Sequence, residues 1–550
     1  MFLESDKVRK IMAVSVVNNG GRKENSMAEK KKENRRLGIA LAAIGIVFVL
    51  TRLFLLTSVP RGLHVDEAGM AYDAFCLANY GTDRYMTWHP VYLTNYGSGQ
   101  SALYAYLASI FIRVIGFRPA AFRLPAVCLG AVTVIFGYLI GRETMKKRSA
   151  VILAGLITLC PYYIMSSRWG LDCNLLLGFF TMSLYWLILA VKRQKTGWFA
   201  LAGASFGVTL YTYAVSYVLL PLFLLFSFFY LLWNRKIKVK HGAAFVVPLA
   251  VLALPLLLFI AVNMGYLEPI FTPLFTIHRL EYYRGGEFSL ANIPANRGLL
   301  KMLLTTDLVQ YNGFPQFGTL YYISVPFLLM GIVLSLVRMV KSVINRSYDA
   351  QTFVAIMFWI IMAVDLVMML PNINKSNAVY FPFIYFVALA FDFLMEKLPF
   401  QRWVTVGIVA AYGVCFLCFG NYYYFHYPEE IYPQQYFNDS LIQMLDRIEG
   451  EYPGGMERNI YVDVSDDNVS QPYIYTLIRK PLSPEEWNAR RGEHNSYGHY
   501  RFFIPEETDE SGIYIMYSNQ EAMERLSRAG FIYEEYNGLW RIYRKEGQDS

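Results

Sequence analysis

The sequence predicts an integral membrane protein of the all-α class, with about eleven transmembrane helices and two large extracytoplasmic loops. A small extracytoplasmic α/β domain is expected at the C-terminus. Of 550 residues, 55% are hydrophobic and only 17% are charged, whereas soluble proteins carry about 25% charged residues. Aromatic residues make up 16%, which is typical of chains with long stretches at lipid interfaces. Residues 421–550 hold 23 acidic and 12 basic residues, against 19 and 38 in residues 1–420. The acidic tail is therefore a separate domain.

Eleven apolar stretches are long enough to cross a membrane, which takes about 20 apolar residues in a helix. They are 37–57, 121–141, 149–167, 174–191, 197–214, 216–233, 242–263, 319–337, 352–370, 378–395 and 403–420. Basic segments separate them at 30–36, 142–148, 192–195, 235–240, 338–346 and 397–402. The positive-inside rule places these segments in the cytoplasm. The prediction is a cytoplasmic segment 1–36 and a transmembrane domain 37–420.

The outer loops follow from this topology. With eleven spans, 58–120 is one outer loop, and the apolar stretch 102–117 within it lies along the membrane surface as an amphipathic helix. Treating 102–117 as a span would instead put the basic segment 142–148 outside. The second large outer loop is 264–318, and the domain 421–550 is outside as well. In that domain Asn537-Gly538 stands between two alternating runs, which predicts a hairpin.

Two adjacent carboxylates, Asp66 and Glu67, follow the first span. Neighbouring residues of a regular element point in different directions, so the two acids can have different roles. One could take a proton from an acceptor hydroxyl or amine, and the other could orient it or bind a positive group. The alternative is a helix start, where both acids stabilise the N-terminal end of the dipole.

Arginines stand at the outer ends of two spans. Arg123 heads the second span and Arg168 follows the third. A guanidinium at the outer end of a span could bind a phosphate group through two parallel hydrogen bonds. Alternatively, Arg168 could pair with Asp172 four residues further on.

Other polar groups gather in the remaining outer segments. Asn374 and Lys375 lie in a turn of amides before the tenth span, and such a turn suits an anionic head group. The loop 264–318 contributes His278 and Arg279. By contrast, Cys415 and Cys418 have the spacing of metal ligands but lie inside an apolar span, which indicates core cysteines.

In order along the chain, these features resemble a known family. The order is the Asp-Glu pair entering a long outer loop, an interfacial helix, Arg123, the segment 167–172 (SRWGLD), the segment 210–214 (LYTYA) with Tyr213, and Asn-x-Asn-Lys at 372–375. The sequence resembles the polytopic C-type glycosyltransferases, specifically the bacterial protein mannosyltransferase and aminoarabinose transferase group. Segment 312–321 also resembles the end of that group's second outer loop. The resemblance covers about 37–395 well and the tail more loosely.

The resemblance implies transfer of a sugar, a hexose, from a polyprenyl-phosphate donor to an extracytoplasmic acceptor, with inversion. By position, Asp66 would be the general base and Glu67 a site-shaping neighbour. Arg168 and Lys375 would hold the lipid phosphate, and Asp172 would orient nearby groups. The remaining substrate-binding candidates are Asn374, Arg123, His278, Arg279 and Tyr213. No metal site is assigned, and the alternative is a divalent cation shared by Glu67, His64, His89 and His278.

The physical chemistry agrees with this hypothesis. A polyprenyl phosphate leaves as an anion, so cations near the breaking bond stabilise the developing charge. The expected partners are the lipid-linked donor, membrane lipid and an acceptor that is a protein, a wall polymer or a glycolipid, with no nucleic acid. The expected location is the cell membrane. The alternatives are a flippase for lipid-linked sugars, which would need inverted repeats and polar groups near the midplane, and an assembly scaffold.

Overall fold

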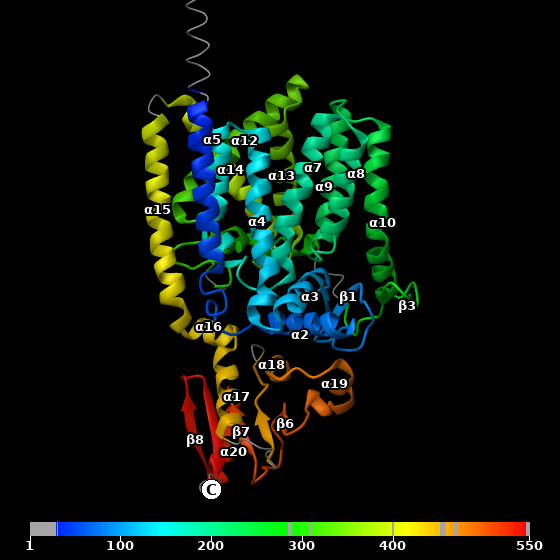
Figure 1. The fold of residues 1–550 in the computed structure, drawn as a ribbon, viewed down its shortest axis with the longest axis vertical. Helices are drawn as coiled ribbons and strands as arrows, with labels where there is room; N and C mark the ends of the chain where they lie inside the picture. Colours follow the sequence, from blue (N-terminus) through cyan, green and yellow to red (C-terminus); the bar gives the residue numbers. More distant parts are fainter. Residues whose placement is uncertain are drawn as a thin grey trace, which may run out of the picture.

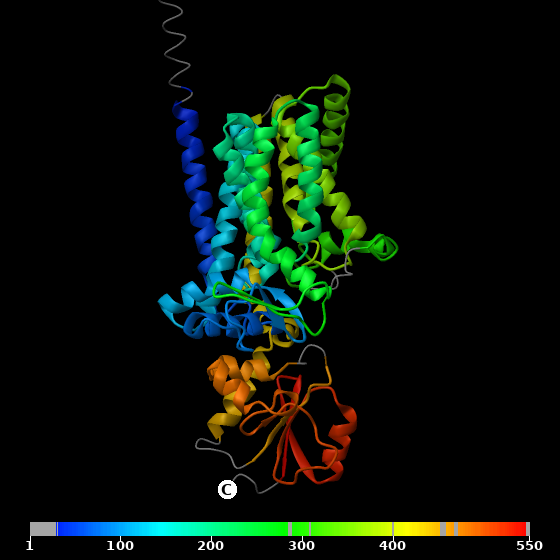
Figure 2. The ribbon, with the colours of Figure 1, turned by 90° about the vertical axis from the view of Figure 1, so that its right-hand side faces the viewer.

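The protein has three layers, as its computed structural model describes them: a bundle of long helices, a thin crosswise layer, and a sheet domain (Figure 1). The described residues are 29, 31–283, 289–306, 310–398, 401–451, 458–466 and 471–545. Most of the expected N-terminal segment 1–36 therefore lies outside the described residues. Figure 2 shows the same order of layers from the side.

Among the described residues, nine helices are long and apolar enough to cross a membrane. They are the helix Lys31–Leu53, α4 (Pro119–Thr144), α7 (Leu176–Arg193), α9 (Ser216–Trp233), α10 (Val239–Asn263), α12 (Val325–Asn345), α13 (Ala350–Met368), α14 (Tyr380–Lys397) and α15 (Gln401–Phe425). The most deeply buried is α14, with 89% of its most apolar stretch inside the protein. Because α14 is apolar on all its faces, it occupies the centre of the bundle.

Two of the eleven expected spans are helical but shorter than predicted. The segment 149–167 divides into α5 (Lys147–Leu159) and α6 (Pro161–Met165). Pro161 causes the break, because its ring holds Cys160 in an extended conformation (φ −71°, ψ 144°). The segment 197–214 forms α8 (Thr196–Thr209), whose 14 residues span about 21 Å, against about 30 Å of bilayer core.

The crosswise layer is built from the first outer loop. Helices α2 (Val65–Tyr80) and α3 (Leu103–Ile115) lie across one end of the bundle (Figure 1). Between them, β1 (Tyr92–Asn95) pairs with β2 (Ser98–Ser101) in an antiparallel hairpin. Its two turn residues, Tyr96 and Gly97, both have positive φ, as the common two-residue hairpin turn requires. The stretch 102–117, expected as a surface helix, is therefore α3 and does not cross the bundle.

The C-terminal domain contains a five-stranded sheet in the order β6-β5-β7-β9-β8. The strands are β5 (Ile460–Val462), β6 (Tyr500–Arg501), β7 (Ile513–Met516), β8 (Phe531–Tyr536) and β9 (Trp540–Lys545), and the helices are α17 (Asp439–Glu451), α18 (Tyr473–Arg479), α19 (Pro484–Arg490) and α20 (Gln520–Arg528). The expected hairpin at Asn537-Gly538 joins β8 to β9, and both residues have positive φ. The remaining short elements are β3 (Ile270–Phe271), β4 (Thr276–Ile277), α11 (Leu299–Thr305) and α16 (Ile431–Tyr436).

Hydrogen bonds and apolar packing connect the C-terminal domain to the crosswise layer. The Tyr475 hydroxyl donates to the carbonyl of Leu63 (3.1 Å), and the Tyr72 hydroxyl donates to the carbonyl of Leu482 (2.8 Å). Helices α2 and α18 pack together at this junction. The chain therefore holds the start of α2 between the membrane domain and the tail.

Candidate functional site

The predicted base, Asp66, stands in the first turn of α2. Its backbone N–H donates to Nδ1 of the capping residue His64 (3.2 Å), so the ring proton of a neutral His64 sits on Nε2. Burial lowers the pKa of His64, which keeps the ring neutral. The Asp66 side chain is 40% exposed, and Asn95 Nδ2 donates to its Oδ1 (3.0 Å). Asp66 is thus held on one side and open on the other.

Aromatic rings from distant parts of the chain surround His64. Its ring centroid lies 5.6 Å from that of Trp169 and 5.3 Å from that of Tyr311. The Tyr311 hydroxyl lies 3.3 Å from Nε2 of His64. Tyr213 packs against the buried cluster of Trp169, Leu171, Cys173 and Phe437. We call the set of His64, Asp66, Trp169, Tyr311, Asn312 and Asn374 the Asp66 cluster.

A chain of amides connects the cluster to the predicted anion-binding turn. Trp169 Nε1 donates to Asn312 Oδ1 (3.2 Å), and Asn312 Nδ2 donates to Asn374 Oδ1 (3.3 Å). The side chain of Asn372 shapes the turn, because its Oδ1 accepts from the backbone N–H groups of Asn374 and Lys375. Hydrogen bonds thus connect Trp169 to the turn of the half-buried Lys375. Ring contacts of Trp169 and Tyr311 with His64 continue this connection to the start of α2, where Asp66 lies.

An apolar groove of 420 Å³ runs between α9 and α10. It is lined by Leu210, Tyr217, Leu220, Pro221, Leu224, Leu225, Phe228, Phe245, Val246, Leu249, Ala253, Leu256, Leu257 and Ile260. The hydroxyl of Tyr217 is buried there without a hydrogen-bond partner among the described residues. Tyr217 stands four residues after Tyr213, which packs against the group of buried residues that contains Trp169.

Glu67 and Arg123 form an ion pair in the interior. Both side chains are fully buried, and Arg123 Nε lies 2.8 Å from Glu67 Oε1. The other guanidinium nitrogens donate to Glu67 and to the carbonyls of Leu56, Pro60 and Gly62. Glu67 also accepts from the N–H of Gly170 (2.8 Å). Neither side chain reaches a surface, so the structure places Arg123 in an internal ion pair and not in the open site where it was expected to bind substrate. Glu67, expected as a site-shaping neighbour of Asp66, is the partner of Arg123 in this pair.

Arg168 is also placed differently from the prediction. Its side chain is fully buried, and it donates to the carbonyls of Thr51, Arg52, Phe54, Leu55 and Val59 at the end of the first span. It therefore has no surface on which a lipid phosphate could bind. The alternative pairing with Asp172 is wrong as well, because Asp172 accepts from the backbone N–H groups of Ser101 and Cys173.

The two residues expected from the second outer loop lie apart from the Asp66 cluster. His278 Nε2 is 2.8 Å from the hydroxyl of Thr94 in β1, and Thr94 alternates with Asn95, so it points to the other face of the hairpin. Arg279 is 46% exposed, near Glu268, and donates to the carbonyl of Leu267 (3.1 Å). The structure does not bring Arg279 to Asp66.

Burial of His278 predicts a pH-dependent stability. It lowers the pKa of this ring to about 4, below the value of about 6.5 in an unfolded chain. The unfolded chain thus takes up a proton below pH 6.5 that the folded protein does not, so stability falls as the pH falls from 6.5 towards 4. We expect His278→Gln to flatten the melting temperature against pH over this range. The exposed His494 gives the control His494→Gln, and parallel curves for all three proteins would contradict the placement of His278.

The residues of the alternative cation site are not brought together. Glu67 is bonded to Arg123, His278 to Thr94, and His89 stacks on Trp88 with ring centroids 4.2 Å apart. Among the described residues, no group of three or more His, Cys, Asp or Glu side chains could hold a metal ion. These four residues therefore do not fit one shared cation.

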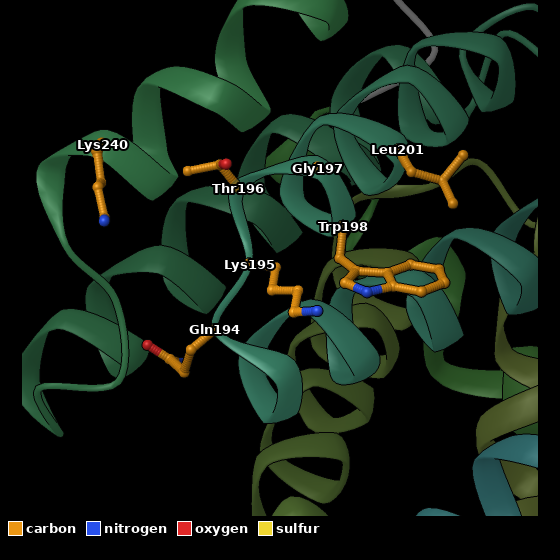
Figure 3. A pocket seen from close by; sticks show the side chains of 7 residues that line it. All are labelled: Gln194, Lys195, Thr196, Gly197, Trp198, Leu201 and Lys240. Carbon is orange, nitrogen blue, oxygen red and sulfur yellow. The ribbon is translucent and has the colours of Figure 1, made fainter.

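A second, open pocket lies at the opposite end of the bundle, where α7 ends (Figure 3). Its lining comes from the turn between α7 and α8 and from the start of α10: Gln194, Lys195, Thr196, Gly197, Trp198, Leu201 and Lys240. It contains two lysines and no carboxylate. This pocket marks the basic end of the bundle, remote from Asp66.

Sequence reasoning missed Asn95 and Tyr311, and found Trp169 and Asn312 only as parts of longer motifs. A signal existed for Asn95, because alternating residues around Tyr96-Gly97 indicate a hairpin beside Asp66. Tyr311 had no such signal, since it gains its role only by contact with His64.

The chain is similar to known proteins in part of its sequence and in its fold. Residues 100–262 match the family described as dolichyl-phosphate-mannose-protein mannosyltransferase. That match includes α3, α4, the segment 167–172 and Tyr213. No protein of curated function matches the chain.

Two solved structures share the fold. ArnT from Cupriavidus metallidurans, bound to undecaprenyl phosphate, is similar with a TM-score of 0.54 and 13% identity over 93% of this chain and 98% of that protein. The oligosaccharyltransferase of Archaeoglobus fulgidus is similar with a TM-score of 0.51 and 16% identity over 80% of this chain. The chain spans 63% of the length of the archaeal enzyme. This multi-span membrane protein therefore has the fold of the polytopic C-type glycosyltransferases, and the resemblance expected from its sequence is confirmed.

Proposed function

We propose that this protein transfers a sugar, a hexose, from a polyprenyl-phosphate donor to an acceptor at the outer face of the cell membrane. Asp66 takes the proton of the acceptor hydroxyl or amine. The acceptor attacks the anomeric carbon from the side opposite the phosphate, so the carbon–oxygen bond to the phosphate breaks with inversion. Polyprenyl phosphate leaves as an anion.

The observation that carries the proposal is the series of ring contacts and hydrogen bonds that leads from the start of α2, at His64 and Asp66, through Trp169, Asn312 and Asn374 to the turn of Lys375. Residues far apart in the chain bring a half-exposed carboxylate and a cation to the same side of the bundle. A base and a cation near the leaving phosphate are the two groups that the reaction needs. The apolar groove beside Tyr217 suits the lipid tail of the donor. The lipid named with the ArnT structure, undecaprenyl phosphate, belongs to the proposed class of leaving group.

The proposed orientation follows from charge. The end of the bundle that carries Lys195 and Lys240 faces the cytoplasm under the positive-inside rule. The Asp66 cluster and the domain 421–550 are then extracytoplasmic, and the segment 1–36 is cytoplasmic. The transferase domain is 37–420, although α15 continues past this boundary to Phe425.

The test is an assay of the purified protein in nanodiscs with radiolabelled polyprenyl-phosphate hexoses and membrane or wall fractions as acceptors. We expect Lys375→Gln to raise KM for the donor about 10- to 100-fold, because a hydrogen bond to a charged group contributes about 1.5–3 kcal/mol. The control is Lys341→Gln, which changes an exposed lysine on α12. An unchanged KM would remove Lys375 from the donor site, and label that changes leaflet without leaving the lipid would favour a flippase.

A further inference from the structure

A series of buried polar side chains, Asp73, Arg84 and Asn95, leads to Oδ1 of Asp66. Asp73 lies two turns further along α2 and therefore on the same helix face as Asp66. The Arg84 side chain pairs with it through Nε to Oδ1 (3.1 Å) and Nη2 to Oδ2 (3.0 Å). Arg84 Nη2 also donates to Asn95 Oδ1 (2.8 Å). Asp73, Arg84 and Asn95 are each at least nine-tenths buried.

The two neighbours of Asn95 fix the orientation of its amide. Arginine has only hydrogen-bond donors, so the atom facing Arg84 must be the Asn95 carbonyl oxygen. An ionised carboxylate has only acceptors, so the atom facing Asp66 must be the Asn95 NH₂ group. Asn95 thus donates to Oδ1 of Asp66 at 3.0 Å. This bond fixes the orientation of the Asp66 carboxylate through its Oδ1 atom.

The backbone of α2 makes room for this arrangement at one residue. A Cβ atom on Gly69 would lie 2.7 Å from the Tyr96 hydroxyl, 2.8 Å from Arg84 Nη2 and 2.9 Å from Asn95 Oδ1. Such distances are too short for a Cβ contact, so a side chain at position 69 would displace the ends of these three side chains.

We propose that Asn95 is a positioning residue for the base. Arg84 orients the Asn95 amide, and the amide holds Oδ1 of Asp66 so that Oδ2 faces the acceptor and receives its proton. Within the described part of the chain, Oδ2 accepts no hydrogen bond, and His64 Nδ1 lies 3.9 Å from it. This inference rests on the proposed role of Asp66.

The proposed substitution at Asn95 leaves the other titratable groups around Asp66 unchanged. They are His64 at the start of α2, Tyr96 of the hairpin, Asp172 and Cys173 ahead of α7, Tyr311, Tyr475 of α18, and Glu67 paired with Arg123. None of them replaces the Asn95 donor at Oδ1. A change at Asn95 therefore reports on this single contact.

The decisive variant is Asn95→Asp, which exchanges one NH₂ group for an oxygen. The new carboxylate still accepts from Arg84, but it meets Oδ1 of Asp66 with a like charge. Two carboxylates at this distance retain a shared proton, so we expect the acid limb of the pH profile of kcat/KM to move up by about 1–2 units. At pH 7 we expect kcat to fall about 10- to 100-fold, with KM for the donor unchanged.

The matched control is Asn79→Asp, the same exchange at an exposed site on α2, where the amide donates only to the carbonyl of Phe75. Gly69→Ala is the second variant, since it displaces Arg84 and Asn95 without removing a polar group, and we expect it to lower kcat several-fold. Asp66→Asn is measured beside them. Normal turnover of Asp66→Asn would overturn the proposed function itself.

The remaining outcomes concern the inference alone. If Asp66→Asn is inactive while Asn95→Asp keeps the wild-type pH profile and kcat, the positioning role is wrong and the base assignment stands. If Asn95→Asp and Gly69→Ala both fail to fold in detergent, this series of buried side chains serves stability only and the inference is overturned.

Discussion

Replacement of Asp66 by Asn is expected to lower kcat by about 10²- to 10⁴-fold, the usual contribution of a general base. The fold should be unaffected, because the amide that replaces the carboxylate keeps an oxygen to accept from Asn95, and the backbone bond to His64 is unchanged. Donor affinity should also stay within about twofold, since in the proposed mechanism Asp66 acts on the acceptor. The measurements are initial rates of release of label, donor binding and the melting temperature.

The control for Asp66 is Asp439→Asn. Asp439 also lies in the first turn of a helix, α17, so the exchange is the same in chemistry and occurs in the same helix turn. We expect its turnover to match that of the wild type. Equal turnover of the Asp66 variant and the wild type would show that another group removes the proton.

Arg123→Met is expected to produce the largest loss of stability, about 3–5 kcal/mol. The change leaves Glu67 as a buried, unpaired charge, and breaking a buried ion pair from one side costs about this amount. It also removes the donors to the carbonyls of Pro60 and Gly62. The melting temperature in detergent, followed by tryptophan fluorescence, measures the effect.

Two comparisons sharpen this prediction. Adding Glu67→Gln to Arg123→Met removes the unpaired charge, so the double variant should be more stable than Arg123→Met alone. Arg61→Met breaks the exposed pair of Arg61 and Glu429 and should cost at most about 1 kcal/mol. Wild-type stability of Arg123→Met, combined with a raised KM for the donor, would instead restore the original prediction that Arg123 binds substrate.

The spans and the tail were predictable because their signals are local. A run of apolar residues such as that of α14 fixes a buried helix, and Asn537-Gly538 fixes the turn between β8 and β9. The break at Pro161 was also local, but apolar residues continue on both sides of it. A prediction from length and composition alone therefore treats α5 and α6 as one span.

The partners of buried charges were not predictable in the same way. Arg168 looks like a phosphate ligand when it is read beside Asp172, yet its partners are the carbonyls of residues more than a hundred positions earlier. The spacing between residues in a chain does not encode such contacts. The same holds for Tyr311 and His64, which meet only after the bundle has formed.

The bond from Tyr475 to the carbonyl of Leu63 has a consequence for biosynthesis. Translation produces residue 63 long before residue 475, so the entry to α2 leaves the ribosome without the tail that later supports it. Tyr311 and Asn374 also arrive late. A partly synthesised chain, already inserted in the membrane, is thus incomplete around Asp66. On the proposed function, it becomes active only after the C-terminal domain has folded against the segment that leads into α2.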